Sequence, residues 1–325
     1  MVLNKYHLKS GFLSLAPMDD VTDRVFRKII KDCYSPDLFF TEFVNVDGLM
    51  SKGREVLRKK LDHPKTEKNL IAQIWGLNPS NFYTIAKEIA DKKFGDFIGV
   101  DLNMGCPDKT VVKNGACSAL INNQELALDI INATKKGLKN KLPLSVKTRL
   151  GFNKIDYSWH EFLLKQNLDM LIIHGRTRSE MSKVPANWEA IAEIRKLKDK
   201  ISPNTLIVGN GDILSFNQAQ EYIKKYKLDG IMIGRGVFQD PFIFSNKSLW
   251  SQMSRLDKFK LFKKHVELYK TTWQDTKPIQ VLNKFCKIYI NNFEGSKEIR
   301  EDLMSSKSSD ELLTKINIQI NQKSK

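Results

Sequence analysis

Eight short apolar runs, rich in β-branched residues, recur before residue 237 and constrain the fold more than any other feature of the sequence. They lie at residues 12–16, 38–42, 70–75, 97–103, 144–150, 170–175, 205–211 and 230–236. Near-continuous hydrophobicity of this kind is typical of strands that are buried on both faces. Helix-like segments separate most of them, including residues 22–32, 79–93, 124–136, 187–198 and 215–226. Strands alternating with helices in this way predict an α/β fold, a parallel (β/α)₈ TIM barrel.

After the eighth run the pattern changes to helices without strands. Apolar residues now recur at three- and four-residue steps, which predicts the buried faces of packed helices. The three stripes are Phe259, Phe262, Val266, Tyr269 and Trp273; Ile279, Leu282, Phe285, Tyr289 and Phe293; and Leu312, Leu313, Ile316 and Ile320. We therefore expect a barrel over residues 1–245 and a C-terminal helical domain over residues 246–325, which suits a chain of 325 residues.

The net charge of +16 favours a polyanionic partner. Residues 244–325 hold 16 basic and 9 acidic side chains, so this tail is about twice as positively charged per residue as the remainder. A lysine-rich composition without functional meaning, as in proteins from AT-rich genomes, stays open as an alternative.

The four cysteines are irregularly spaced and form no C-x-x-C pair, so we expect neither a disulfide framework nor a metal site. The N-terminal residues lack the apolar core of a signal peptide, and no apolar run approaches 18 residues. These features predict a cytoplasmic protein without a membrane partner.

Functional residues of a TIM barrel lie at the carboxyl ends of its strands, and seven of the eight predicted strands carry polar or glycine-rich residues there. In strand order these are Pro17, Met18 and Asp19; Gln73; Asn103 and Cys106; Lys147 and Arg149; His174 and Arg176; Asn210, Gly211 and Asp212; and Gly234, Arg235 and Gly236. Such agreement among seven strand ends indicates a functional site.

The glycine-rich ends of the seventh and eighth strands predict a phosphate site. Exposed backbone N–H groups and a following helix start attract an anion, and Arg235 adds a positive charge. Neither G-x-G-x-x-G nor a P-loop is present, so a mononucleotide cofactor such as FMN suits these loops better than a dinucleotide domain. A tight turn without a ligand is the alternative.

Lys147 stands in the middle of the fifth predicted strand, so its side chain should point into the barrel. An unpaired ammonium there would be costly, and we expect it to face an anionic group such as a reduced flavin. The alternatives are a Schiff-base lysine of a barrel aldolase and a buried ion pair.

Cys106 follows the fourth strand between Gly105 and Pro107, where a thiol could deliver a proton to a substrate carbon. Asn103 can both donate to and accept from the edge of a uracil base. A packing role is the alternative for Cys106 and our interpretation of Cys33, Cys117 and Cys286.

Six segments of the chain carry a family resemblance: APMDDVTDRVFR (16–27), DLNMGCPDKTV (101–111), SVKTRLG (145–151), HGRT (174–177), NGDI (210–213) and IGRG (233–236). In order and spacing they resemble the motifs of the tRNA-dihydrouridine synthases, over residues 12–243. The resemblance implies an FMN-dependent oxidoreductase that reduces the C5=C6 bond of tRNA uridines, with NADPH as the reductant.

The resemblance also implies roles for single residues. Cys106 would protonate C5, and substrate contacts would come from Asn103, Arg149 and Arg176. The flavin would be held by Pro17, Met18, Asp19, Gln73, Lys147 and His174, and its phosphate by Asn210, Gly211, Asp212, Gly234 and Arg235. The pair Asp19-Asp20 departs from the family, in which many members have a small residue and glycine here.

Two other functions remain open at this stage. One is an FMN-dependent oxidoreductase of free pyrimidines, similar to dihydroorotate dehydrogenase, which would need no basic tail. The other is a catalytically silent RNA-binding barrel. For the family we expect a monomer, with residues 246–325 contacting tRNA; the sequence does not specify the modified position.

Overall fold

Nine parallel strands form one sheet in the described part of the chain, which comprises residues 6, 8–274 and 276–322 of the computed structural model. They are β1 (Phe12–Leu15), β2 (Phe39–Phe40), β3 (Val44–Asn45), β4 (Leu70–Trp75), β5 (Gly99–Met104), β6 (Leu144–Arg149), β7 (Met170–His174), β8 (Leu206–Asn210) and β9 (Gly230–Ile233). The order is β1-β9-β8-β7-β6-β5-β4-β2, and a bridge between Ser14 and Leu38 joins β1 to the start of β2. The sheet closes on itself, so the predicted TIM barrel is confirmed.

The second predicted strand, at residues 38–42, is divided in the structure into β2 and β3. Between them the Gln73 backbone N–H donates to the Thr41 side-chain oxygen at 3.1 Å, in place of a backbone carbonyl. The ladder is therefore interrupted at Thr41 and resumes where Val44 pairs with Ile74. A side-chain acceptor of this kind leaves no trace in the hydrophobic pattern.

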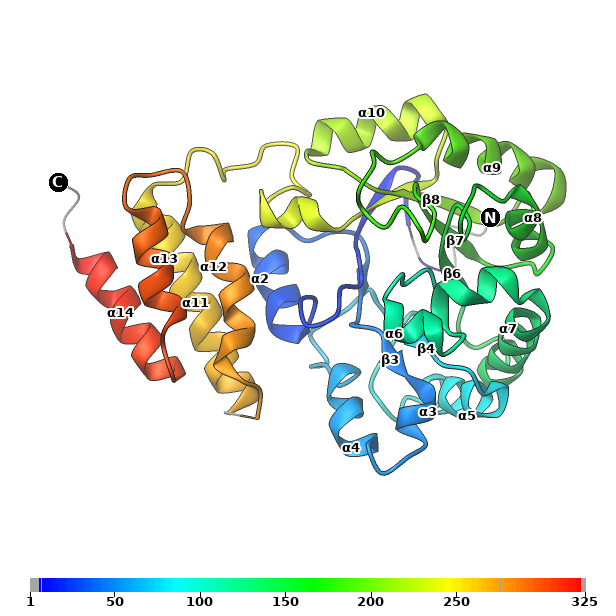
Figure 1. Ribbon diagram of the computed structural model, residues 1–325, viewed down its shortest axis with the longest axis horizontal. Coiled ribbons are helices and arrows are strands. Elements are labelled where there is room, and N and C mark those ends of the chain that lie inside the picture. The colour runs from blue at the N-terminus through cyan, green and yellow to red at the C-terminus, as the bar shows by residue number, and fades with distance from the viewer. Residues whose placement is uncertain (1–5, 7, 275, 323–325) are drawn as a thin grey trace. The chain divides into compact units, whose positions relative to one another are not determined.

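Helices α5, α7, α8, α9 and α10 connect the strands of the barrel (Figure 1). Their bounds are α5 (Pro79–Ala90), α7 (Gln124–Leu138), α8 (Tyr157–Leu164), α9 (Trp188–Ile201) and α10 (Phe216–Tyr226). Shorter segments are α3 (Val46–Leu49), α4 (Arg54–Leu57), η1 (Arg58–Lys60), α6 (Lys109–Lys113) and η2 (Cys117–Asn122). The predicted start of α5 is confirmed, because Pro79 is its first residue and the Asn78 side chain accepts from the Ser80 N–H at 3.0 Å.

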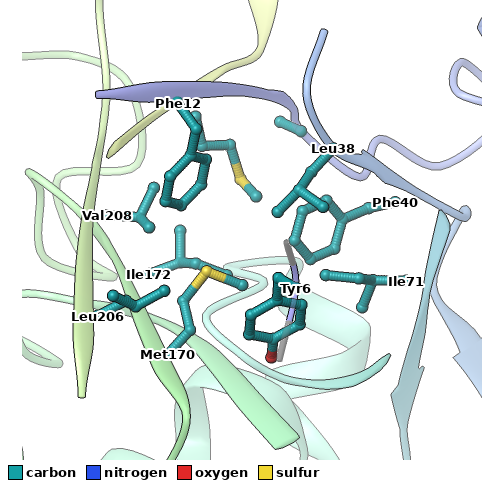
Figure 2. Packing of buried hydrophobic residues seen from close by; sticks show 11 residues of the cluster. Tyr6, Phe12, Leu38, Phe40, Ile71, Met170, Ile172, Leu206 and Val208 are labelled. Carbon is teal, nitrogen blue, oxygen red and sulfur yellow. The ribbon is translucent and has the colours of Figure 1, made fainter. Parts of the chain in front are cut away.

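Large apolar side chains from opposite strands fill the interior of the barrel (Figure 2). Ile71 of β4, Ile172 of β7 and Val208 of β8 are fully buried there, and Tyr6 packs among them. Side chains two positions apart on a strand share a face. The polar residues that follow this apolar layer on the inner face therefore lie toward the carboxyl ends of the strands.

The chain divides into two compact units, and the second is helical. The barrel unit contains residues up to 24, 36–213 and 217–234, while the second combines 25–35 and 214–216 with the chain from 235 onward. Its helices are α2 (Arg24–Tyr34), η3 (Arg235–Phe238), α11 (Arg255–Trp273), η4 (Ile279–Leu282), α12 (Asn283–Tyr289), α13 (Ser296–Met304) and α14 (Ser309–Asn321). The expected C-terminal helices are therefore confirmed.

The apolar stripes predicted for these helices supply the core of the second unit. Phe262, Val266 and Tyr289 are buried, and the rings of Phe262 and Tyr289 stack with centroids 5.0 Å apart. Ile279 and Phe293, at the two ends of the second stripe, are only half-buried. Among the described helices none is long and apolar enough to cross a membrane.

Candidate active site

Three polar side chains lie in one row across β4, β5 and β6, one layer above the apolar interior. Gln73 pairs in register with Asp101, and Asp101 with Ser145. The Asp101 carboxylate accepts from Gln73 Nε2 at 2.6 Å and from Ser145 Oγ at 2.5 Å. Burial raises the pKa of Asp101 to about 6, although these two hydrogen bonds act to lower it. The row gives a buried carboxylate with both oxygens bonded.

The next row, two residues further along the strands, contains Asn103 and Lys147, which are paired in register. Asn103 shapes the loop that carries Cys106: its Oδ1 accepts from the Gly105 N–H at 3.1 Å and the Cys106 N–H at 3.0 Å. The loop also lies against β6, since a Cβ on Gly105 would stand 3.1 Å from the Thr148 Cα. The position of Cys106 is therefore fixed from two sides.

Arg149 also holds this loop. Its Nε donates to the Gly105 carbonyl at 2.8 Å, and its Nη1 donates to the carbonyls of Thr177 and Met181 at 3.0 and 2.9 Å. Burial and the nearby positive charge of Arg176 lower the pKa of Arg149 to about 10, and Cys106 partly offsets this. Three of its N–H groups thus bind backbone, and its assignment to the substrate stays a prediction.

The Cys106 thiol is half-buried, and burial raises its pKa above the usual value. A thiol in this state remains protonated at neutral pH, which suits a proton donor better than a nucleophile. Cys117 and Cys286 are fully buried and Cys33 is half-buried. Burial also raises the pKa of each of these three, in agreement with a packing role.

Lys147 makes no ion pair or hydrogen bond through its side chain with any residue that the structure describes. It shares the inner face of the sheet with its register partner Ile172, which belongs to the interior apolar cluster. Burial and the positive charge of Arg149 lower the pKa of Lys147 to about 8. The alternative of a buried ion pair is therefore not supported, and the ammonium is available to an anionic ligand.

His174 and Arg176, at the end of β7, are bonded to each other. Arg176 Nη1 lies 3.1 Å from His174 Nε2, and because a guanidinium only donates, His174 accepts there. Arg176 is also bonded to the Asp212 carboxylate and the Val184 carbonyl, and only 2% of its surface is exposed. These contacts hold the pair in one arrangement.

The ends of β8 and β9 offer backbone rather than side chains. Asn210 Nδ2 donates to the Met232 carbonyl at 2.8 Å. This side-chain donor replaces the backbone N–H that would continue the ladder between β8 and β9. Gly211 and Gly234 donate no N–H hydrogen bond to a described residue. Gly211 has φ +134°, and a Cβ there would lie 2.7 Å from the Ala186 Cβ. This backbone fits an anionic group such as a phosphate.

Arg235 and Asp212 complete the predicted phosphate set. Arg235 is exposed and follows Gly234 as the first residue of η3. Asp212 has φ +52° and turns its carboxylate to Arg176 and to the Ala186 N–H, at 2.9 Å from the latter. A phosphate would therefore meet the backbone of Asp212 and not its charge.

The loop after β1 carries Pro17, Met18 and Asp19, and a buried carboxylate just after β2 holds it. Glu42 is fully buried, and its Oε1 accepts from the Asp20 N–H at 2.8 Å. Lys60 of η1 lies 3.6 Å from Glu42 Oε1 and is also bonded to Asp19. The Asp19 carboxylate is thus turned to Lys60, which gives the acidic pair of this loop a structural role.

Comparison with known proteins decides the family. The model of the family described as dihydrouridine synthase (Dus) matches residues 14–325. A probable tRNA-dihydrouridine synthase 2 of Bacillus subtilis (strain 168) is 41% identical over 310 residues, which cover 94% of this chain and 93% of that protein. A probable tRNA-dihydrouridine synthase of Staphylococcus aureus (strain COL) is 41% identical over 305 residues, 93% of this chain and 90% of its own. The chain belongs to the dihydrouridine synthase family.

Solved structures agree with the barrel. Histamine dehydrogenase from Rhizobium sp. 4-9 matches with a TM-score of 0.56 and 12% identity, covering 98% of this chain and 65% of its own. DHODH from Eimeria tenella matches with a TM-score of 0.51 and 14% identity, covering 71% and 78%. At such low identity the likeness shows the fold alone.

For this dihydrouridine synthase family member, the predicted strand-end residues up to Gly234 lie at one end of the barrel unit, whereas Arg235 and Gly236 belong to the second unit. Four residues that the sequence pattern did not indicate hold Gln73 and the loop after β1: Asp101, Ser145, Glu42 and Lys60. Asp101 gave one signal, as an acid inside the apolar run 97–103, but its partners come from neighbouring strands. Glu42 ended the run 38–42 and gave a similar signal.

Proposed function

We propose that this protein reduces the C5=C6 bond of uridines in tRNA to give dihydrouridine, with FMN as cofactor and NADPH as reductant. Family membership carries this proposal. Within it, residues 1–245 form the FMN-binding catalytic barrel and residues 246–325 bind tRNA. We further propose that it acts as a monomer in the cytoplasm.

The chemistry of the strand ends fits FMN. An ammonium without a described protein partner, at Lys147, suits the N1–C2=O side of a flavin, where negative charge gathers on reduction. The Gly211 and Gly234 amides suit its phosphate. Asn210, Asp212 and Arg235 are our further candidates for contact with it. Pro17, Met18, Asp19, Gln73 and His174 would line the ring.

FMN, when bound and reduced, supplies the hydride that C6 of the uracil receives. Cys106 then protonates C5. Burial raises the pKa of its thiol, so the proton remains on sulfur until it is transferred to the carbanion-like carbon. The S–H bond breaks as the C5–H bond forms, and the thiolate regains a proton from solvent. Asn103 and Arg149 hold the loop by hydrogen bonds to its backbone and so position Cys106 for this transfer.

The uracil edge would be read by the remaining donors of the site. Asn103 Nδ2 has a second hydrogen beyond the one directed at Gln73. Arg176 and Arg149 are our further candidates for substrate contact. A base inside an RNA must be extruded to reach such a pocket. We assign the binding of the flanking RNA to the positively charged helical unit.

Dihydrouridine measured by mass spectrometry tests the function. Purified protein is incubated with NADPH and tRNA that lacks modification, and its absorption spectrum is recorded beforehand. We expect a flavin spectrum and dihydrouridine in the tRNA.

Two results would contradict the proposal in different ways. Turnover of free uracil or orotate with none on tRNA would support a pyrimidine oxidoreductase. A colourless protein that binds tRNA and does not gain activity with added FMN would support a silent RNA-binding barrel.

A further inference from the structure

A continuous chain of hydrogen bonds leads from the buried Asp101 to the loop of Cys106. Asp101 Oδ2 accepts from Gln73 Nε2 at 2.6 Å, and Gln73 Oε1 accepts from Asn103 Nδ2 at 3.3 Å. Asn103 Oδ1 then accepts from the Gly105 and Cys106 N–H groups at 3.1 and 3.0 Å. Asp101, Gln73 and Asn103 are exposed by 0, 0 and 7%, so water cannot readily replace these bonds.

The direction of this chain is determined from both of its ends. Backbone N–H groups only donate, so Asn103 must turn its oxygen to the loop and its nitrogen to Gln73. Gln73 must then offer its oxygen to Asn103 and its nitrogen to Asp101. A carboxylate only accepts, so Asp101 satisfies this nitrogen in either orientation of its own side chain.

We propose that Asp101 is a positioning residue that sets the orientation of the Gln73 and Asn103 amides and thereby places Cys106. If the Gln73 amide were reversed, its nitrogen would face the Asn103 nitrogen. Asn103 would then have to turn its own nitrogen toward the loop, and the Gly105 and Cys106 N–H groups would lose their acceptor. The importance for catalysis rests on the proposed function, whereas the placement of the thiol does not.

The groups that face Asp101 support this assignment. Ser145 Oγ donates to Oδ1 at 2.5 Å, so both carboxylate oxygens are engaged. Lys147 supplies a nearby positive charge that favours the ionised form. Tyr6 also lies near Asp101, and burial and nearby carboxylates keep its phenol neutral by raising its pKa. Nothing in the proposed reaction requires Asp101 to exchange a proton.

An exchange of the acid and the amide tests the direction of the chain. In Asn103→Asp, two carboxylates face the single Gln73 amide, and one contact becomes acceptor to acceptor. Adding Asp101→Asn lets the Gln73 amide reverse, so that its nitrogen donates to the new carboxylate at position 103 and its oxygen accepts from the new amide at position 101. The loop N–H groups keep their acceptor, and Ser145 can still donate to the amide oxygen that the second substitution introduces.

The rate at which iodoacetamide alkylates Cys106 is the readout, measured by peptide mass spectrometry as a function of pH. The pH series separates a changed thiol pKa from changed access, and Cys33 on the same protein is the internal control. We expect Asn103→Asp to speed alkylation about tenfold through local opening, and the double variant to return within about twofold of Asp101→Asn. A double variant as fast as Asn103→Asp would overturn the proposal.

A third substitution separates the hydrogen-bond chain from simple repulsion between two carboxylates. In a Gln73→Met background the amide is gone, while both charges remain. We expect the rescue by Asp101→Asn to disappear there; rescue of the same size would show that charge alone is responsible and would overturn the proposal.

Should Asn103→Asp fail to fold, Gln73→Met alone decides. We expect it to speed alkylation of Cys106 roughly threefold, with Cys33 unchanged, because it removes one link between Asp101 and the loop. An unchanged rate would overturn the proposal. A protein that shows the coupling and makes no dihydrouridine would refute the proposed function and leave this inference standing.

Discussion

The carboxyl end of the barrel and the helical unit both carry many charged side chains, but they differ in where these charges lie. In the barrel, Asp101, Arg149 and Arg176 are at most 7% exposed and are fixed by hydrogen bonds. In the helical unit, Lys260 and Lys287 are exposed and surround an apolar core. Buried charges define geometry, whereas exposed charges add up as a field that salt screens.

This difference predicts two kinds of mutational response. A substitution at the carboxyl end of the barrel should abolish one chemical step or the binding of one ligand. The remaining steps and ligands should be unaffected. A substitution on the helical surface should weaken RNA binding by degrees and in proportion to the charge removed.

Replacing Cys106 by alanine should have the largest effect of the substitutions considered. Loss of a general acid costs on the order of 10²–10⁴-fold in rate, so dihydrouridine formation should fall within this range. FMN content and NADPH oxidation should persist, because neither uses the thiol. Cys33→Ala is the control, and tRNA turnover equal to that of the unchanged protein would refute the proton-donor role.

Replacing Gly211 by alanine should weaken FMN binding while tRNA affinity is kept. The added Cβ would lie 2.7 Å from the Ala186 Cβ at a φ of +134°, so the loop must shift at the proposed phosphate site. Strain of about 1–3 kcal/mol would raise the Kd for FMN by roughly 5- to 150-fold, measured by flavin fluorescence on apoprotein.

Gly295→Ala is the matched control for this experiment. Gly295 also has a positive φ, +76°, but no atom lies within 4 Å of an added Cβ. The Gly295→Ala variant should lose about 1 kcal/mol of folding stability and keep its FMN affinity. An equal loss of FMN affinity in both variants would show that general destabilisation, and not the phosphate loop, is responsible.

The sequence predicted the barrel well because burial on both faces leaves a strong hydrophobic pattern. It also located the strand ends, since Gln73, Lys147 and Arg149 are polar intrusions into apolar runs. That the Lys147 ammonium has no ion pair among the described residues agrees with the expectation that it faces a ligand.

Partners could not be predicted, because they depend on register and on loop closure. Arg149 and Arg176 look equivalent in sequence, yet Arg149 binds three backbone carbonyls and Arg176 binds Asp212 and His174. Asp101 was visible in the sequence as an acid within the run 97–103. Its link to Cys106 through Gln73 could not be predicted, because it depends on the pairing of β4 with β5. Helix α2 follows the first strand in sequence and was expected among the barrel helices, whereas most of it belongs to the helical unit.

Neutralising lysines of the helical unit should give the smallest and most graded effect. Lys264 is unsuitable because it lies 2.7 Å from Asp32 of α2, so its replacement would also remove an ion pair. Lys247, Lys260 and Lys287, which are exposed and form no ion pair with a described residue, replaced together by glutamine should weaken tRNA binding, most at low salt. For each phosphate that the variant no longer neutralises, the slope of log K against log salt should become shallower by about 0.7–0.9.

The matched control is a triple substitution at the amino-terminal ends of the strands, where α7, α8 and α9 lead into β6, β7 and β8: Lys139, Lys165 and Lys200 to glutamine. It removes the same charge from the amino-terminal side of the strands. If tRNA binding depends on the helical unit, the two triples differ in slope although their net charges are equal. Equal slopes would mean that total charge attracts the RNA, and the tail would then be an ordinary solvated surface.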